Sequence, residues 1–553
     1  MDTILRASKE LQNEKFPVGL CYSGILFSKG KAINVYEQLM YMNRDGATKS
    51  LWQNNVPGYD ASENEPEAEV YDVIIVGGGI TGLTTALLLQ EAGKKCIVAE
   101  AQTLGFGTTS GTTGHLNTLL DLTYDKIQKN FGAENARLVL KSTIEAIALV
   151  SENVEKYHIS CEFSKQSGYL FSQNDQQTDA LKEAFEVSKN IGCNVAYSDT
   201  IPVPVDFEKA LIFKDQAQIH PTKYLYGLAK AFEESGGTIL QNCRVTNVKE
   251  NDLNTLEAET SYGSITALHL IYATHIPPGV NLLHFRCAPW RSYAMAVKLK
   301  EGNYPDGLAY DLYDPYHYYR TQEKDGEKYL VAGGQDHKTA EEKNTEECFE
   351  KLERYFRKYF DISRVDYKWS SQYYIPADGL PYIGHLPGNP DSVFAATGYG
   401  GNGITFSQVA AKILRDLIVT GESEYKDLYS PSRVKPVAGF TEFMKNAADV
   451  TAKLAGKILP THKINDLQEM ANGEARVVSY EGQSLALYKD ENGDIHSVDP
   501  ACTHIHCTVS WNTAEKAWEC PCHGSRFSQD GEMLTAPARK DLEKIDLNPD
   551  PLS

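Results

Sequence analysis

The sequence lacks three features that would place it in a membrane, nucleic-acid-binding or secreted class. No uncharged apolar run in its 553 residues reaches the roughly 18 residues that a membrane-spanning helix requires. Basic residues are outnumbered: 54 Lys and Arg against 74 Asp and Glu give a formal net charge of −20, whereas non-specific nucleic-acid binding requires a basic surface. The N-terminus has no basic segment followed by an apolar block and a small-residue cleavage site. We therefore expect a soluble cytoplasmic protein.

Length and patterning predict four regions. A chain of 553 residues with 42% hydrophobic residues can form two to four domains. The predicted regions are an N-terminal extension and linker (1–69), an α/β domain (70–425), a helical connector (426–465) and a small all-β domain (466–548). Because residues 1–41 show no clear periodicity, Met42 is an alternative to Met1 as the natural start. N-terminal sequencing of the native protein would decide between the two.

The connector carries an amphipathic pattern among prolines and lysines. Its apolar residues recur at roughly helical spacing: Phe440, Phe443, Val450, Leu454 and Ile458. A helix of this kind can lie on a membrane surface. The acidic character of the chain favours a connector packed between two domains, so peripheral membrane contact is only the alternative.

A glycine-rich turn marks a dinucleotide site in the α/β domain. The motif is Gly77, Gly78, Gly79, Ile80, Thr81 and Gly82, between the strand YDVIIV and a predicted helix over 80–92. Gly77 permits the tight turn, Gly79 lets the backbone approach a pyrophosphate, and Gly82 lets the helix pack on the strand. Glu100 ends the second strand, where a carboxylate can hold ribose hydroxyls. The pattern predicts a bound dinucleotide.

The same region resembles the D-amino-acid-oxidase-like flavoproteins, which include glycine and sarcosine oxidases. The resemblance covers roughly 70–420 and is carried by ordered runs at 72–101, 105–117, 218–248, 271–278, 377–384 and 396–406. It implies FAD as the cofactor. The implied contacts are Thr108 and Thr109 near the flavin, Val245 at the adenine, Ala273 and Thr274 at the pyrophosphate, and Gly400, Gly401, Asn402, Gly403 and Ile404 at the pyrimidine ring.

The chain departs from this family where the substrate would bind. The amino-acid oxidases have an Arg before the D-G-x-P-x-I-G segment, and this chain has QYY at 372–374 instead. Arg291 or Arg320 could hold a substrate carboxylate, since a guanidinium suits it, although a structural ion pair is the alternative for both. The candidate substrate-contacting residues are Tyr319, Arg320 and Tyr373.

Two further absences bear on the flavin. Some members of the family bind FAD covalently through a His or a Cys. This chain has Gly111 at the position of that His and no Cys near 371–384, so we expect non-covalent FAD. His115 and His275 are candidate polar contacts to the flavin or hydrogen-bonded structural residues. No second G-x-G-x-x-G lies between two strands, so electrons are expected to enter from an organic substrate and not from NAD(P)H.

A cluster of cysteine and histidine near the C-terminus predicts a metal site. It comprises Cys502, His504, His506, Cys507, Cys520, Cys522 and His523, whereas the other seven cysteines are scattered and read as reduced. Cys502 and His504 form C-x-H, and Cys520 and His523 form C-x-x-H. Two thiolates and two imidazoles suit a Rieske 2Fe–2S centre, with tetrahedral zinc as the rival. His506 is expected at the surface.

Residues 466–545 resemble the Rieske proteins of respiratory cytochrome bc complexes. The flanking runs CTHIHC and CPCHGSRF carry this resemblance. It implies a disulfide between Cys507 and Cys522 and a hydrogen bond from Ser525 to a bridging sulfide. Phe527 replaces the tyrosine of high-potential members, and Pro537 matches the loop that covers the cluster.

Together the motifs predict an α/β (α+β) FAD-binding Rossmann-like domain with an antiparallel-sheet substrate domain, followed by a small all-β Rieske domain. The expected activity is dehydrogenation of an amine or amino-acid-like substrate at its C–N bond, with electrons leaving singly through the 2Fe–2S cluster to an external acceptor. The alternatives are a NAD(P)H- or carrier-linked reductase and a redox sensor. A Rieske non-haem oxygenase is disfavoured because we find no 2-His-1-carboxylate pattern.

Overall fold

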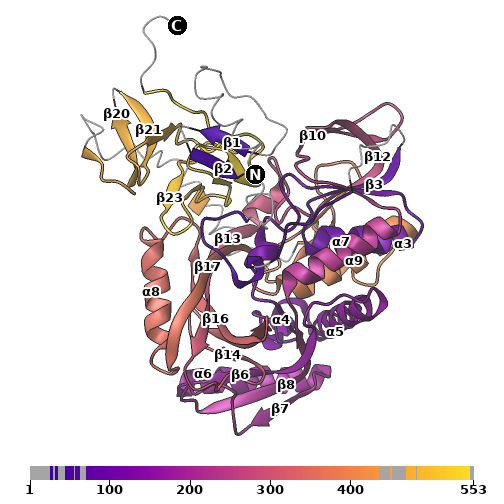
Figure 1. Ribbon diagram of the computed structural model, residues 1–553. Helices are drawn as coiled ribbons and strands as arrows, with labels where there is room; N and C mark the ends of the chain where they lie inside the picture. The colour runs from indigo at the N-terminus through magenta and orange to yellow at the C-terminus, as the bar shows by residue number, and fades with distance from the viewer. Residues whose placement is uncertain are drawn as a thin grey trace, which may run out of the picture.

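The computed structural model describes most of the chain (Figure 1). The described residues are 25–28, 31–34, 44–54, 56–62, 70–434, 449–450, 469–480 and 482–547. The first two ranges form strands β1 (Ile25–Ser28) and β2 (Lys31–Asn34). Residues 1–24 and Met42, and most of the connector predicted over 426–465, lie outside the described residues.

An eight-stranded sheet forms the core of the first domain. Its strands follow the order β10-β11-β12-β3-β4-β9, with β19 beside β12 and β18 beside β19. The strand bounds are β3 (Tyr71–Val76), β4 (Cys96–Ala99), β9 (Thr238–Leu240), β10 (Val245–Glu250), β11 (Leu256–Thr260), β12 (Gly263–Tyr272), β18 (Tyr382–His385) and β19 (Val393–Thr397). β3 pairs in parallel with β4 and β12, as the predicted strand–turn–helix–strand requires.

The apolar residues of β3 explain why it lies at the centre. Val73 and Ile75 pack into a core with the helices, whereas Ile74 and Val76 pack into a second core on the other face. A strand covered on both faces reads as a continuous apolar run, which is the pattern of YDVIIV. This arrangement fixes the glycine turn at the carboxyl edge of the sheet.

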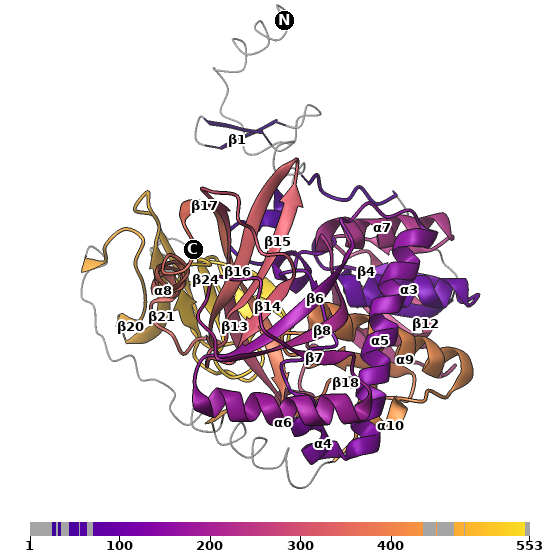
Figure 2. The same ribbon diagram turned by 90° about the horizontal axis from the view of Figure 1, so that it is seen from below.

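Most helices cover the first core and lie on the side of the molecule away from the C-terminal domain, but the helix over Thr345–Phe356 lies beside that domain (Figure 2). The helix bounds are α3 (Ile80–Glu91), α4 (Tyr124–Phe131), α5 (Ala133–Lys156), α6 (Asp175–Ile191), α7 (Pro221–Glu234), α8 (Thr345–Phe356), α9 (Gly403–Thr420) and α10 (Lys426–Tyr429). The helical stretch expected over 125–157 is two helices, because Gly132 ends α4 and caps α5. The short 3-10 helices are η2 (Leu51–Gln53), η3 (Thr108–Gly111) and η4 (Leu282–Phe285).

A nine-stranded, mostly antiparallel sheet forms the substrate domain. Its order is β17-β13-β16-β15-β14-β6-β8-β5, with β7 beside β8. The bounds are β5 (His115–Leu116), β6 (Ser164–Ser172), β7 (Val195–Ser198), β8 (Lys209–Gln218), β13 (Cys287–Leu299), β14 (Leu308–Asp311), β15 (Tyr318–Lys324), β16 (Glu327–Lys338) and β17 (Ile362–Pro376). The register aligns Arg291 of β13 with Gln372 of β17 and His337 of β16. The expected antiparallel sheet is confirmed.

Residues 469–547 form a small domain of two antiparallel sheets, so the all-β prediction is confirmed. The strands are β20 (Ala475–Tyr480), β21 (Gln483–Lys489), β22 (Ile495–Val498), β23 (Ser510–Asn512), β24 (Ala517–Glu519), β25 (Arg526–Phe527) and β26 (Met533–Thr535). Their core packs around Trp518, Phe527 and the four clustered cysteines. Among the described residues, no helix is long and apolar enough to cross a membrane.

Residues 44–54 differ from the linker expected there. Leu51 and Trp52 are fully buried in a core with Trp369 of β17, and Trp52 Nε1 donates to the Thr112 carbonyl at 2.5 Å. Arg44 is also buried. The segment is short and polar, so its sequence carries no periodic signal, yet it belongs to the folded domain.

Buried ion pairs join the two domains. Arg291 of β13 pairs with Glu519 of β24, and Arg44 Nη1 lies 3.2 Å from Glu515 Oε2. Glu515 Oε1 also accepts from Ser370 Oγ at 2.6 Å. Burial alone would raise the pKa of Glu515. The positive charges of Arg44, Arg291 and Arg526 outweigh this effect and lower the pKa to about 2. Figure 1 shows the C-terminal domain seated beside the β13 and β17 ends of the antiparallel sheet.

Candidate functional site

A cavity of about 310 Å³ runs from the glycine turn to the antiparallel sheet. It is lined by nearly all the predicted cofactor residues: Gly77, Gly79, Ile80, Thr81, Glu100, Thr108, Thr109, Val245, Ala273, Thr274, Gly400, Gly401, Asn402, Gly403 and Ile404. Gly82 does not line it. A Cβ there would lie 2.0 Å from the Gly77 carbonyl oxygen, so Gly82 serves the close packing of α3 on the turn.

One end of the cavity fits a dinucleotide. Gly77 has φ +112°, and a Cβ there would lie 2.6 Å from the Ala273 carbonyl, so only glycine leaves this cradle open. The N-terminus of α3 begins just beyond it, where unpaired N–H groups favour phosphate. Glu100 faces the same end, and its Oε2 accepts from the Gly78 N–H at 2.6 Å. Burial raises the pKa of Glu100 despite this bond.

The other end is bordered by η3 and the turn before α9. Thr108 Oγ1 lies 3.1 Å from His275 Nδ1 and donates to the Gln372 carbonyl at 3.2 Å. Burial lowers the pKa of His275 to about 4, so its ring is neutral at pH 7. Across the cavity, the Gly401 N–H donates to Asp121 Oδ2 at 2.7 Å. This end therefore offers neutral polar groups and two carboxylates, those of Asp121 and Asp336.

Only one of the three predicted substrate contacts reaches the cavity. Tyr373 lines it and donates its hydroxyl to Asp336 Oδ2 at 2.7 Å. Tyr319 points to the opposite face of the sheet, where its ring packs on Phe356 and Phe360. Side chains alternate along a strand, so Tyr318 faces the cavity and Tyr319 does not.

The two candidate arginines hold structure. Arg320 Nη1 donates to the carbonyls of Thr113, Gly114 and Ile219 at 2.9–3.1 Å, and Arg291 is committed to Glu519 and Ser370. Neither lines the cavity. The expectation that Tyr319 and Arg320 contact the substrate is therefore wrong. Tyr319 is a core residue, and Arg320 hydrogen-bonds the loop that contains Thr113 and Gly114 to β15.

Sequence reasoning missed most of the side chains at the substrate end. Besides His115, which the sequence had marked as a candidate flavin contact, the lining there includes Asn117, Asp121, Tyr310, Tyr316, Tyr318 and Asp336. His115 Nδ1 lies 2.5 Å from the Tyr310 hydroxyl, and burial holds the pKa of His115 well below its usual value. Period-two alternation in YHYYR could have identified Tyr318, but no local pattern marks either aspartate.

The predicted cluster ligands converge in the C-terminal domain. Cys502 and Cys520 are buried free thiols. Hydrogen bonding from Cys520 lowers the pKa of Cys502, and the Ser525 side chain also contributes. His504 Nδ1 is buried without a hydrogen-bond partner among the described residues. Buried polar atoms are normally paired, and the His504 and His523 rings lie 4.9 Å apart, so the orphaned nitrogen fits a bound iron–sulfur cluster.

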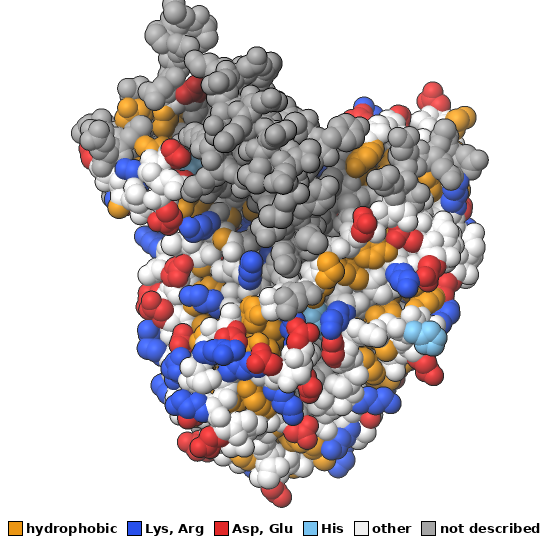
Figure 3. Space-filling model, viewed as in Figure 1, with side chains coloured by type: hydrophobic (Ala, Val, Ile, Leu, Met, Phe, Trp, Pro, Cys, Tyr) orange, Lys and Arg blue, Asp and Glu red, His pale blue; other side chains and the backbone are white. Residues whose placement is uncertain are grey.

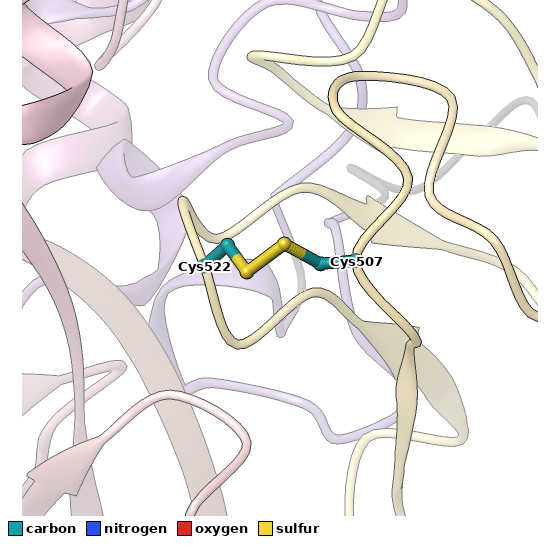
Figure 4. Close-up of a disulfide and its surroundings, with 2 residues drawn as sticks. All are labelled: Cys507 and Cys522. Carbon is teal, nitrogen blue, oxygen red and sulfur yellow. A yellow bond between two sulfur atoms is a disulfide. The ribbon is translucent and has the colours of Figure 1, made fainter. Parts of the chain in front are cut away.

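A disulfide ties the two cluster loops together (Figure 4). It joins Cys507 to Cys522, with Cα atoms 6.5 Å apart, and thus confirms the pairing that the resemblance implied. The sulfur atoms of Cys507, Cys520 and Cys522 lie within 4.8 Å of one another. His506 is exposed, as expected, and Phe527 is fully buried.

The cluster loops face the flavin domain. The His284 ring lies 4.7 Å from that of His504 and 5.5 Å from that of His523. Tyr374 donates its hydroxyl to the His523 carbonyl at 3.1 Å, and Gln372 Nε2 donates to the Gly524 carbonyl at 2.9 Å. Both Gln372 and Tyr374 line the cavity. One layer of side chains therefore separates the cavity from the loop that carries His523.

The C-terminal domain also closes the dinucleotide end. Residues Met533 to Ala536 line the cavity, and so do Ala538 and Arg539. The Pro537 carbonyl accepts from the Gly279 N–H at 2.9 Å. The proline loop therefore contacts the flavin domain as well as flanking the cluster loops.

Comparison with known proteins agrees with both halves of the chain. Residues 72–417 match the family described as FAD dependent oxidoreductase, and residues 461–546 match the Rieske [2Fe-2S] domain, which decides against zinc. The Rieske 2Fe-2S iron–sulfur protein YhfW of Bacillus subtilis is 32% identical over 91% of this chain and 98% of its own length. Gamma-glutamylputrescine oxidoreductase of Escherichia coli is 26% identical over 69% of this chain and 91% of its own.

A solved structure shows the same fold over the first domain. Glycine oxidase from Geobacillus kaustophilus superposes with a TM-score of 0.55 at 18% identity, covering 66% of this chain and all of the other. The family matches and the geometry therefore agree on three parts of the chain. These are the glycine turn at 77–82, the loop around Thr108 and Thr109, and the loops that carry Cys502, His504, Cys520 and His523. The chain belongs to the FAD-dependent oxidoreductase family and carries a C-terminal Rieske [2Fe-2S] domain.

Proposed function

We propose that the protein dehydrogenates an amine or amino-acid-like substrate at its C–N bond and passes the electrons singly through its own Rieske domain to an external acceptor. Similarity to gamma-glutamylputrescine oxidoreductase and the fold of glycine oxidase support this reaction class. When bound, FAD takes a hydride from the substrate and the 2Fe–2S cluster carries one electron at a time.

The main support for the proposal is the contact between the cavity wall and the loop that contains His523 and Gly524. Tyr374 and Gln372 line the cavity and donate to the carbonyls of His523 and Gly524. The His275 ring packs edge-on against Tyr374 with centroids 4.7 Å apart. Gln372 and Tyr374 are buried, so they would exclude water from the space between the two redox sites.

The residues assigned to each cofactor follow from their positions. FAD would be held by the cavity-lining residues of the predicted set, with Gly82 supporting the turn from behind. The cluster would be held by Cys502, His504, Cys520 and His523. The buried disulfide braces the loops: Cys507 and Cys522 are only 1% and 4% exposed. Such a shielded pair is poorly accessible to glutathione, which disfavours the sensor alternative.

The test is anaerobic mixing of the full-length holoprotein with amines and amino acids while absorbance and EPR spectra are recorded. We expect one compound to bleach the flavin absorbance and a Rieske EPR signal to follow without a mediator. Reduction of both centres by NADH, with no response to any amine or amino acid, would overturn the proposal in favour of a reductase.

A further inference from the structure

The substrate end of the cavity is an acidic, aromatic chamber. Its six members, called the amine cage below, are Asp121, Tyr310, Tyr316, Tyr318, Asp336 and Tyr373. They come from β14, β15, β16, β17 and the segments before α4 and β15. The β-sheet register brings them together from positions up to 252 residues apart in the numbering, from Asp121 to Tyr373.

The two carboxylates of the cage form no salt bridge with a cationic side chain in the described part of the chain. Asp336 Oδ2 accepts from Tyr373, while its Oδ1 is buried without a hydrogen-bond partner among the described residues. Asp121 Oδ2 accepts only from the Gly401 N–H. The negative charge of Asp121 acts on Asp336, so the two repel each other. Asp121 is open to the cavity and Asp336 is partly buried, so a cation that entered the cavity would meet two carboxylates that no side chain neutralises.

The arginines on the cavity wall do not supply that partner. Among the described residues, the lining contains Arg244 and Arg539 and no lysine. Arg244 donates to the Met533 carbonyl and its charge acts on Glu100, while Arg539 donates to the Pro278 carbonyl. Both therefore lie at the dinucleotide end. A substrate carboxylate would meet two carboxylates and no guanidinium in the cage.

The aromatic walls suit a cation. The His115 ring lies 5.4 Å from the Tyr310 ring and 5.8 Å from the Tyr318 ring, and the Tyr316 and Tyr318 rings are 5.9 Å apart. Tyrosine faces attract alkylammonium groups within about 6 Å of the ring centroid. The burial of His115 keeps its ring neutral, so it adds no competing charge.

We propose that the amine cage binds an aliphatic ammonium group and excludes carboxylates, so that the substrate is a cationic amine and not an amino acid. The cage supplies the counter-charges through Asp121 and Asp336 and the apolar walls through the four tyrosines. This assignment rests on the proposed function for the identity of the reaction, but ammonium binding itself can be measured without turnover.

The first experiment measures binding to the wild-type holoprotein by calorimetry and by perturbation of the flavin spectrum. The probes are butyltrimethylammonium, butyrate and butan-1-ol, which share an unbranched four-carbon chain and differ in charge. The quaternary nitrogen cannot become a neutral amine, so no oxidation interferes. We expect butyltrimethylammonium to bind at least about tenfold more tightly than the other two. Equal binding of all three, or preferred binding of butyrate, would overturn the proposal.

A variant pair locates the binding. Asp336→Asn removes one charge from the cage, and we expect it to weaken binding of butyltrimethylammonium more than about tenfold. Asp252→Asn is the matched control, because Asp252 is exposed in the β10–β11 turn and should change affinity less than about twofold. Unchanged affinity in Asp336→Asn would contradict the cage. If that variant does not fold, the relative affinities of the wild-type holoprotein for the three probes still test the proposal.

The outcomes for cage and reaction are separable. Binding of butyltrimethylammonium without flavin bleaching by any amine would leave the cage in place and refute the proposed reaction. Flavin bleaching by amino acids, with no binding of butyltrimethylammonium, would support the reaction and refute the cage.

Discussion

Individual buried ionic side chains stabilise the interface between the two domains. Glu515 lies at the centre of the interface, where its carboxylate accepts from Arg44, Ser370 and Thr48. Arg526 on the same domain pairs with Asp45 at 2.5 Å. Breaking a buried pair leaves an uncompensated charge, which costs far more than losing a surface pair.

We therefore predict that Glu515→Gln lowers the free energy of unfolding by about 3–5 kcal/mol, because Arg44 loses its buried counter-charge. Denaturant unfolding of the holoprotein would measure the change. Asp361→Asn removes an acid from an exposed pair with Lys300 and serves as control, with an expected change below about 1 kcal/mol. A loss in Glu515→Gln no larger than in the control would contradict a structural role for this interface.

Ammonium binding should depend on pH through the cage carboxyls. Burial raises the pKa of both Asp121 and Asp336 to about 6. As the pH falls through 6 these groups gain protons and lose their attraction for a cation, so the affinity for butyltrimethylammonium should fall from pH 8 to pH 5. The ligand carries a permanent charge and does not titrate. Affinity that is constant over this range would contradict the role given to the two aspartates.

The other titratable groups around the cage are of two kinds. Some keep one protonation state between pH 5 and pH 8, and His317 is hydrogen-bonded to another residue. Burial raises the pKa of Tyr310, Tyr316, Tyr318 and Tyr373 and lowers that of His115. His317, whose charge acts on Asp336, is hydrogen-bonded to Asp311 at 2.8 Å. Asp121 and Asp336 are thus the carboxyl groups of the cage whose ionisation the binding curve should report, and Asp336→Asn separates their contribution from that of His317.

At the scale of elements, β17 is the wall shared by both redox sites. Gln372 and Tyr374 of β17 reach the loop between β24 and β25, where Gly524 has φ +77°. A Cβ on Gly524 would lie 2.7 Å from Gln372 Nε2, 2.8 Å from Pro289 Cβ and 2.9 Å from the Tyr374 hydroxyl. The loop can approach this wall only because it carries glycine there.

We predict that Gly524→Ala displaces the cluster loop and slows reduction of the cluster by substrate roughly tenfold or more. Stopped-flow absorbance and freeze-quench EPR would measure the rate. Gly482→Ala is the matched control: Gly482 has φ +84°, but a Cβ there meets no atom within 4 Å. The control should share the backbone strain and keep the rate. Equal rates in the two variants would contradict a role for the close approach.

Local elements were predictable from sequence, whereas the substrate end was not. β3, the glycine turn and α3 follow one another in the chain, so a short window contains the whole signal. Asp121, Asp336 and Tyr373 meet only through sheet register, which no local pattern encodes. The prediction of Tyr319 was wrong because alternation along β15 places Tyr318, and not Tyr319, on the cavity side. The buried segment at 44–54 carried no periodic signal.

At the scale of the whole molecule, the cluster loops are turned inward. His504 and His523 lie against His284 in the flavin domain, and His506 is exposed on the same loop as His504. On the face shown in Figure 3, acidic and basic side chains are interspersed over the described surface. The inward position of the cluster loops is compatible with the proposed electron flow from the cavity to the cluster within one chain.

The central claim is this internal path, and dilution tests it most directly. The holoprotein is mixed anaerobically with saturating substrate, and the rate at which the Rieske EPR signal appears is measured over a hundredfold range of protein concentration. An internal path predicts a first-order rate that does not change with protein concentration. A rate that rises in proportion to protein concentration, or a cluster that stays oxidised while the flavin is bleached, would contradict it.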